Sequence, residues 1–222
     1  MRRALPKQLF FALLVRPLVF LLLGVAVHRR DRLPRTGPAI VVANHNSHLD
    51  ALLLMSLFPL AQLPSVRPLA ARDYFFRSRL GTFFARHYLG AIPVERNSHG
   101  RTDPLAGARE ALRRGEVVVL FPEGTRGEPG RLAPLRPGVA HLAKAFPEVP
   151  IVPCHLKGLE RALPRGEGLL VPFICDATVG EPLYWGGSRE QLMTDLEAAM
   201  AALQSGVGGH SMNSECTSDV QA

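Results

Sequence analysis

The chain has 222 residues, 47% of them apolar and 20% charged, which suits a single domain that buries its own core. Its 20 glycines, 19 prolines and three cysteines are too few for a collagen, a low-complexity protein or a disulfide scaffold. The whole net charge of +7 lies in residues 1–36, because residues 37–222 hold equal numbers of acidic and basic side chains. This distribution argues against nucleic-acid binding and indicates contact with an anionic membrane surface.

The first predicted element is the apolar segment from Leu9 to Val27, which follows a basic N-terminus. As a helix it would reach ~28 Å, roughly one hydrocarbon core. Three interpretations stay open: a transmembrane helix, a signal peptide cleaved near Gly24, and two short helices bent at Arg16 and Pro17 that lie in one leaflet. Arginine at mid-bilayer costs about 2.5–3.5 kcal/mol, and proline interrupts the helical hydrogen bonds. The bent pair is therefore favoured, with Arg16 reaching the lipid phosphates.

After residue 36, short apolar runs alternate with helical patterns. The predicted strands cover residues 39–43, 117–121, 151–155 and 169–178, and the predicted helices cover 49–57, 104–114 and 188–203. This alternation predicts an α/β fold: a single domain with a mixed, mainly parallel sheet flanked by helices, plus an N-terminal membrane-associated helical segment.

The same pattern divides the chain into three parts. Residues 1–30 are predicted to form a membrane-anchoring helical segment, and residues 31–203 the α/β domain. Residues 204–222 are polar, rich in Gly and Ser and without periodicity, which predicts a disordered tail. The three cysteines show no Cys-x-x-Cys spacing, so no metal or redox motif is predicted from them.

The first candidate for catalysis is the segment NHNSHLD at residues 44–50, directly after the first predicted strand. On one continuous helix, His45 and Asp50 would diverge by about 140°. They meet only if His45 lies in a turn and Asp50 in the first helical turn, which Ser47 supports as an N-cap. Asp50 would then accept the Nδ1 proton of His45 and leave Nε2 free to take a proton from an alcohol.

Two other interpretations of these residues stay open. Asp50 could simply complete a capping box and interact with the helix dipole, with His45 as an ordinary turn residue. His45, His48 and Asp50 also have metal-ligand chemistry, as in a metal-dependent phosphoesterase. Their spacing differs from that of binuclear hydrolases and no further ligand group follows, so no metal site is predicted.

The second candidate is the segment FPEGTR at residues 121–126, at the end of the strongest predicted strand. Proteins of the α/β class bind ligands at the carboxyl ends of strands. Gly124 permits close backbone approach, and Thr125 and Arg126 offer donors that suit a phosphate. A surface turn with an incidental arginine is the alternative.

The third candidate is Arg96, which follows the apolar residues 90–94 and Glu95. It is either a phosphate ligand or a solvated partner of Glu95. The sequence has no Gly-x-Ser-x-Gly elbow, so a serine acyl-enzyme is unsupported. It also has no P-loop and no Gly-x-Gly-x-x-Gly fingerprint, which argues against nucleotide cofactors.

Four segments in this order resemble the glycerolipid acyltransferase family, most closely the bacterial 1-acyl-sn-glycerol-3-phosphate acyltransferases. They are residues 44–50 with their His-x4-Asp spacing, 92–96 (IPVER), 121–126 (FPEGTR) and 151–153 (IVP). The resemblance covers roughly residues 30–185. It implies that His45 is a general base and that Asp50 orients it. The substrate-binding residues that it implies are Arg96, Glu123, Gly124, Thr125 and Arg126.

The resemblance also implies a reaction. An acyl thioester, either acyl-CoA or acyl-ACP (acyl carrier protein), would acylate the sn-2 hydroxyl of 1-acyl-glycerol-3-phosphate in one step and give phosphatidic acid for phospholipid biosynthesis. No metal or other cofactor is expected, and another lysolipid acceptor, such as a lyso-aminolipid, is the alternative. The implied partners are lysophosphatidic acid and a membrane phospholipid surface, on the cytoplasmic face of the bacterial inner membrane, through an anchor that does not cross the bilayer. Aromatic residues at 74–76 and 83–84 would either line the acyl chain or, more commonly, belong to the core.

Overall fold

The computed structural model describes residues 5–22, 24–47, 49–95, 103–124, 133–159 and 175–206. Within these residues the centre is a seven-stranded sheet in the order β1-β7-β6-β2-β5-β3-β4. The strands are β1 (Val25–His28), β2 (Ala39–Ala43), β3 (Val66–Ala71), β4 (Ile92–Val94), β5 (Val117–Leu120), β6 (Ile151–Lys157) and β7 (Cys175–Val179). Neighbouring strands are parallel except β6 and β7, which are antiparallel. The predicted mixed, mainly parallel sheet is confirmed.

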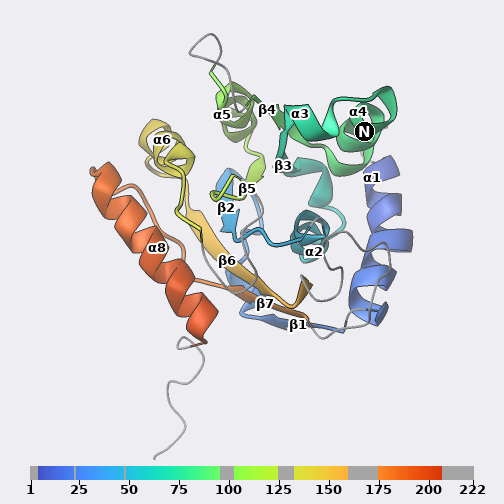
Figure 1. The fold of residues 1–222 in the computed structure, drawn as a ribbon, viewed down its shortest axis with the longest axis horizontal. Helices are drawn as coiled ribbons and strands as arrows, with labels where there is room; N and C mark the ends of the chain where they lie inside the picture. Colours follow the sequence, from blue (N-terminus) through green and yellow to red (C-terminus); the bar gives the residue numbers. More distant parts are fainter. Residues whose placement is uncertain are drawn as a thin grey trace, which may run out of the picture.

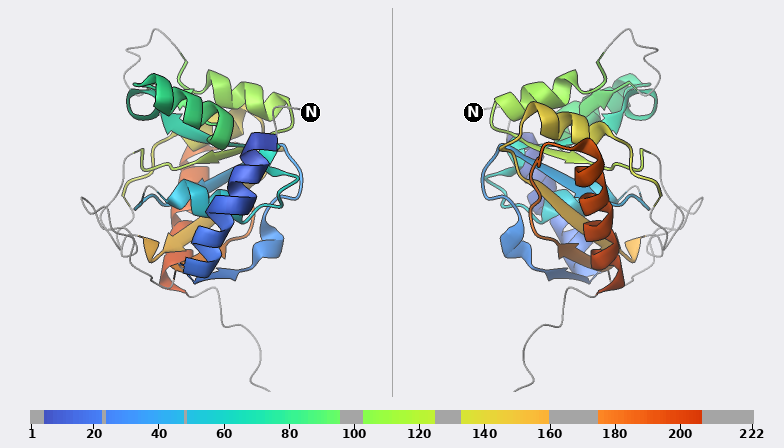
Figure 2. Two further views of the ribbon diagram at one scale, coloured as in Figure 1. Left: turned by 90° about the vertical axis from the view of Figure 1, so that its right-hand side faces the viewer. Right: turned by 90° about the vertical axis from the view of Figure 1, so that its left-hand side faces the viewer.

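Helices cover both faces of this sheet, so the domain has three layers (Figures 1 and 2). The α-helices are α1 (Leu5–Phe10), α2 (Asp50–Ser56), α3 (Arg72–Phe75), α4 (Arg79–Phe84), α5 (Ala106–Arg113), α6 (Gly138–Ala145) and α8 (Arg189–Ser205). Shorter segments are the π-type η1 (Phe11–Val15), η2 (Pro17–Leu22) and η5 (Ala85–Leu89), and the 3₁₀ turns η3 (Arg30–Arg32) and η4 (Leu63–Ser65). The N-terminal helix and α2 pack on one face, and α5, α6 and α8 pack on the other.

The central strand β2 shows why its sequence is a continuous apolar run. Ala39, Val41 and Ala43 face the layer that contains α2, while Ile40 and Val42 face the layer that contains α8. All five side chains are fully buried, as expected when successive residues of a parallel strand point to opposite covered faces.

The C-terminal helix α8 begins as predicted. The Ser188 hydroxyl accepts a hydrogen bond from the amide of Gln191, which satisfies one of the free donors of the first turn. The helix continues through Ser205 and ends at Gly206, which adopts a left-handed conformation with φ of 72°. The predicted tail from residue 204 therefore overlaps the last helical turn, and residues 207–222 lie outside the described part.

The apolar N-terminal segment differs from the predicted bent pair. The helix runs without a break from Leu5 to Leu22, and Arg16 itself has helical backbone angles (φ −65°, ψ −47°). It passes Pro17 in π-type turns, whose amides bond to carbonyl groups five residues back. Residues 25–27 then leave the helix, because β1 pairs in parallel with β7. The membrane-anchoring part predicted for residues 1–30 thus contributes a strand to the sheet.

Arg16 also has a different environment from the one predicted. Its Nη2 donates to the carbonyl oxygen of Phe58 at 2.5 Å, just after α2, so it points into the domain instead of toward lipid phosphates. Phe11, Val15 and Val19 on the same helix are at most 2% exposed in the core. Among the described residues, no helix has both the length and the apolar character to cross a membrane.

Candidate active site

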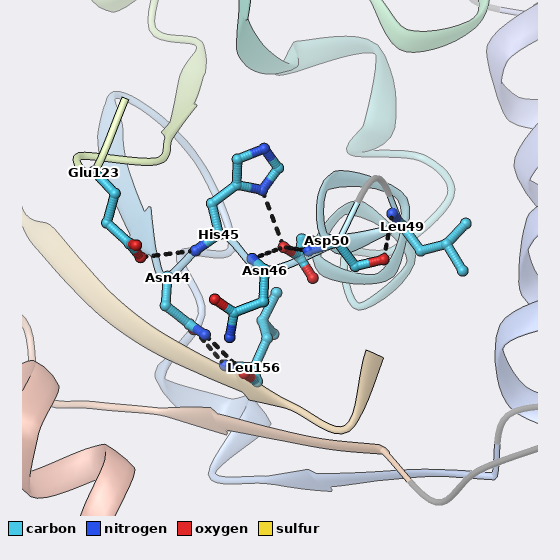
Figure 3. A network of polar contacts seen from close by, with 8 residues as sticks. Asn44, His45, Asn46, Leu49, Asp50, Glu123 and Leu156 are labelled. Atoms are coloured by element: carbon cyan, nitrogen blue, oxygen red, sulfur yellow. Dashed lines mark hydrogen bonds and ion pairs between the residues drawn. The ribbon is translucent and has the colours of Figure 1, made fainter. Parts of the chain in front are cut away.

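The first and third sequence segments meet at one edge of the sheet. Strands β2 and β5 are parallel neighbours, with Val42 opposite Leu120. Parallel neighbours end at the same edge, so the segments that follow them, residues 44–47 with 49–50 and residues 121–124, lie side by side (Figure 3). This carboxyl edge is where open α/β sheets bind ligands.

At this edge His45 and Asp50 face each other. His45 lies in the turn after β2, Asp50 is the first residue of α2, and the Nδ1 atom of His45 lies 3.0 Å from Oδ2 of Asp50 (Figure 3). The Asp50 side chain is 1% exposed and the His45 side chain is 22% exposed. A buried carboxylate at this position selects the imidazole tautomer with the proton on Nδ1, which leaves Nε2 as an acceptor.

The same Asp50 oxygen also caps the turn. Oδ2 accepts the backbone amides of Asn46 at 2.6 Å and Ser47 at 2.7 Å. The capping and imidazole-pairing interpretations of Asp50 are therefore both realised in the geometry. The helix itself begins at Asp50, later than the predicted cap at Ser47, whose hydroxyl instead accepts the amide of Leu49 within the turn.

Glu123 holds the backbone of the histidine. Its Oε1 accepts the amide of His45 at 2.9 Å, and its side chain is only 4% exposed. Burial raises the pKa of the Glu123 carboxyl, although the backbone amides of His45 and Ala133 partly oppose that rise. This contact joins the third sequence segment directly to the first.

Two further residues position the turn, and no role for either is evident from the sequence pattern. The Phe121 ring stacks on the His45 imidazole, with centroids 4.4 Å apart and an interplanar angle of 27°. The Asn44 amide donates to the carbonyl of Leu156 at 2.8 Å and accepts the Leu156 amide at 2.7 Å. Both residues lie inside the recognised segments, but only the tertiary pairing of β2 with β5 and β6 gives them partners.

Gly124 has a backbone conformation that favours glycine, and the Arg136 side chain packs closely against it. Its φ is +71°, in the left-handed region. A Cβ on Gly124 would lie 2.4 Å from Nε of Arg136, so the guanidinium stem rests against this glycine. The backbone amide of Arg136 also donates to the Pro122 carbonyl at 2.8 Å. The fold thus brings Arg136 to the third segment.

Three predicted site residues fall outside the described part of the chain: Arg96, Thr125 and Arg126. His48, which was considered only for the metal site that is not predicted, also lies outside it. Among the residues that are described, no three His, Cys, Asp or Glu side chains form a metal-binding group. Of the aromatic runs, Phe83 and Phe84 are 53% and 37% exposed, so neither is buried in the core. Their role in lining an acyl chain stays a prediction.

Comparison with known proteins agrees with this arrangement. A family model described as Acyltransferase matches residues 24–157, which include both site segments. The chain belongs to the Acyltransferase family. The family resemblance inferred from the four sequence segments is therefore confirmed.

Individual members of the Acyltransferase family resemble the chain over most of its length. The chloroplast 1-acyl-sn-glycerol-3-phosphate acyltransferases of Brassica napus and Arabidopsis thaliana are 32% and 33% identical to it over 74% and 77% of the chain. The chain spans 46% of each of these two relatives. The Bacillus subtilis enzyme of the same name is 25% identical, over 79% of this chain and 84% of that protein.

A solved structure shares the fold. The 1-acyl-sn-glycerophosphate (LPA) acyltransferase from Thermotoga maritima superposes with a TM-score of 0.74 at 21% identity, covering 95% of this chain and 81% of that one. The three-layer architecture is thus that of a known acyltransferase structure.

Proposed function

We propose that this protein transfers an acyl group from an acyl thioester to the sn-2 hydroxyl of 1-acyl-glycerol-3-phosphate and forms phosphatidic acid. The observation that carries the proposal is the 3.0 Å contact between Nδ1 of His45 and Oδ2 of the buried Asp50. The names of the relatives from Brassica napus, Arabidopsis thaliana and Bacillus subtilis support the acceptor.

In the proposed mechanism His45 is the general base. Its Nε2 takes the proton of the sn-2 hydroxyl while the hydroxyl oxygen forms a bond to the thioester carbonyl carbon. The carbon–sulfur bond then breaks, and the imidazolium returns the proton to the departing thiolate. Asp50 stabilises the positive imidazole between these steps, which is what a buried carboxylate on Nδ1 can supply. A thiol is a good leaving group, so the step uses no covalent enzyme intermediate.

The proposed acceptor site lies beside this pair. Gly124, Thr125 and Arg126 line it, Arg96 contacts the phosphate, and Glu123 fixes the backbone of His45 at its edge. Holding the phosphate places the hydroxyl near Nε2, and such positioning can supply a large part of a rate enhancement.

The proposed setting is a membrane, because the acceptor is a lipid. The acyl donor is acyl-CoA or acyl-ACP, no other cofactor takes part, and the protein works on the cytoplasmic face of the bacterial inner membrane. The positive charge of residues 1–36 supports attraction to anionic lipid through the basic side chains other than Lys7, Arg16 and Arg30, which bond to carbonyl groups of the domain.

The decisive experiment is mass spectrometry of lipids formed from a panel of lysolipids, each supplied with acyl-CoA and with acyl-ACP. Phosphatidic acid from lysophosphatidic acid is the expected product of the wild type. A His45→Ala variant that unfolds like the wild type should lose about 10²–10⁴-fold in turnover. Faster turnover of a lyso-aminolipid would move the proposal to that acceptor, and full activity of the folded variant would refute the role of His45. A parallel incubation with chelator tests for metal dependence.

A further inference from the structure

An exposed apolar face lies on the connection between β3 and β4. On α4, Leu80 is 83% exposed and Phe83 is 53% exposed. Large apolar side chains gathered on one exposed face usually mark an interaction site. We define the α4 face as Leu80, Phe83 and Phe84.

The α4 face adjoins the exposed apolar side of the N-terminal helix. The Phe10 ring on α1 packs edge-on against Phe84 and Tyr88, with centroids 5.4 Å and 5.2 Å apart. On the same N-terminal helix, Leu9 and Leu13 are 47% and 73% exposed. Figure 2 shows the end of α1 next to α4. Two helices from different parts of the chain thus present their apolar side chains together.

The charged side chains of residues 74–94 are all arginines, and Asp73 and Glu95 flank this stretch. Arg77, Arg79 and Arg86 are exposed, and within the described residues no carboxylate forms an ion pair with any of them. Residues 74–94 contain no acidic side chain at all. A second copy of the chain would bring arginines against arginines, so like charges oppose self-association through this face. Anionic phosphate groups above an apolar layer are complementary to it.

We propose that the α4 face is a second membrane-docking element, separate from the N-terminal helix, which inserts Leu80 and Phe83 among the acyl chains of an anionic phospholipid bilayer. Arg77, Arg79 and Arg86 then lie at the level of the lipid phosphates. The inference deepens the proposed function, because a lipid acceptor must reach His45 from such a surface.

A tryptophan probe tests insertion directly. The chain has one tryptophan, so Phe83→Trp is made in a Trp185→Phe background and mixed with vesicles of phosphatidylcholine and phosphatidylglycerol whose acyl chains carry bromine. Quenching of the indole fluorescence at position 83 is expected. The matched control is Tyr184→Trp in the same background, since Tyr184 is 54% exposed and its chain neighbours Leu183 and Trp185 pack against the helix layer on the opposite face of the sheet. Bound protein with an unquenched probe at position 83 overturns the proposal.

Partitioning of variants to vesicles tests the apolar and the basic side chains of this region separately. Leu80→Ser with Phe83→Ser should weaken binding at least about tenfold, while the control Tyr184→Ser should not. Arg77→Gln, Arg79→Gln and Arg86→Gln together should weaken binding only to vesicles that contain phosphatidylglycerol, and the exposed control Arg189→Gln should not. If the double serine variant or the triple glutamine variant binds vesicles as tightly as the wild type, the proposal is overturned. It is also overturned if the wild type is a dimer in solution and the double serine variant is a monomer.

Activity in detergent separates this proposal from the proposed function. The serine variant should acylate lysophosphatidic acid in mixed micelles at the wild-type rate and be slower only on vesicles. Equal rates of variant and wild type on vesicles would overturn membrane docking by this face. Absence of wild-type activity in micelles would refute the proposed reaction and leave the partitioning result in place.

Discussion

A single oxygen atom organises the candidate site at the scale of residues. Oδ2 of Asp50 accepts the amides of Asn46 and Ser47 and lies at hydrogen-bond distance from Nδ1 of His45. Hydrogen bonds to a charged acceptor are stronger than neutral ones, so the turn that carries His45 is held by the group that would also stabilise the imidazolium. Local folding and proposed catalysis therefore depend on the same carboxylate.

The two roles of Asp50 can be separated by substitution. Asp50→Asn keeps an acceptor oxygen for the turn but removes the negative charge, so we expect turnover to fall about 10²–10⁴-fold with a small change in the free energy of unfolding. Asp50→Ala removes both and should also unfold at a lower temperature. Turnover measured with thermal unfolding checks this, and an Asp50→Asn variant with wild-type turnover would leave Asp50 only its capping role.

Lys7 supplies a second prediction at this scale. Its Nζ donates to the carbonyl of Val66 at 2.6 Å, and the side chain is 3% exposed. Burial, followed by the charge of Arg67, lowers the pKa of Lys7 to about 7, and Glu116 partly opposes this.

A lowered pKa means that the folded protein holds fewer protons on Lys7 than the unfolded chain between pH 7 and about 10.5. This group therefore makes the free energy of unfolding rise with pH across that window. We therefore expect the free energy of unfolding, measured with urea, to increase more from pH 7 to pH 9.5 in the wild type than in a Lys7→Met variant. Equal gains would contradict the prediction, and the exposed Lys144→Met serves as the control.

At the scale of elements, α2 is held at both ends. Asp50 begins it, while beyond its last turn Arg16 donates to the Phe58 carbonyl and Arg30 donates twice to the Leu57 carbonyl. Cations at a helix C-terminus satisfy free carbonyl groups and interact favourably with the helix dipole. The N-terminal helix and η3 thereby position the helix whose first residue contacts His45.

Arg16→Met tests this arrangement. We expect the free energy of unfolding to fall by about 1–3 kcal/mol, because a carbonyl loses its charged donor, while partitioning to vesicles stays unchanged. Chemical denaturation and vesicle flotation measure the two quantities. The reverse pattern, normal stability with weaker vesicle binding, would restore the prediction that Arg16 reaches the phosphates.

At the scale of the whole molecule, the N-terminal helix is part of the folded domain. Phe11, Val15 and Val19 are buried against the sheet, whereas Leu13 and Leu21 on the same helix are 73% and 84% exposed. The helix therefore has one side packed in the core and one side that is exposed.

Deleting residues 1–22 should accordingly do more than release the protein from membranes. We expect the truncated chain to lose cooperative thermal unfolding even in detergent, because the core loses the three buried side chains of this helix. The full-length control Leu13→Ser with Leu21→Ser should unfold like the wild type. Cooperative unfolding of the truncated protein, at the temperature of the intact one, would contradict this.

The sequence by itself predicts those features that depend on nearby residues. The apolar runs of β2 and β5 are typical of strands buried on both faces, and Ser188 indicates the start of α8. His45 and Asp50 are five residues apart, so a turn and the start of a helix are enough to bring them together. The order of the four segments along the chain also indicates the family, because that order can be read from the sequence without any tertiary contact.

Only the tertiary structure decides the contacts between distant segments. Glu123 lies 78 residues from His45, and Leu156 lies 112 residues from Asn44, yet each pair is joined by a hydrogen bond because β5 and β6 flank β2. The N-terminal helix shows the same limit: apolar side chains suit a protein core and a lipid layer equally. Which side of that helix is buried depends on the surface that it meets, and no local pattern contains that information.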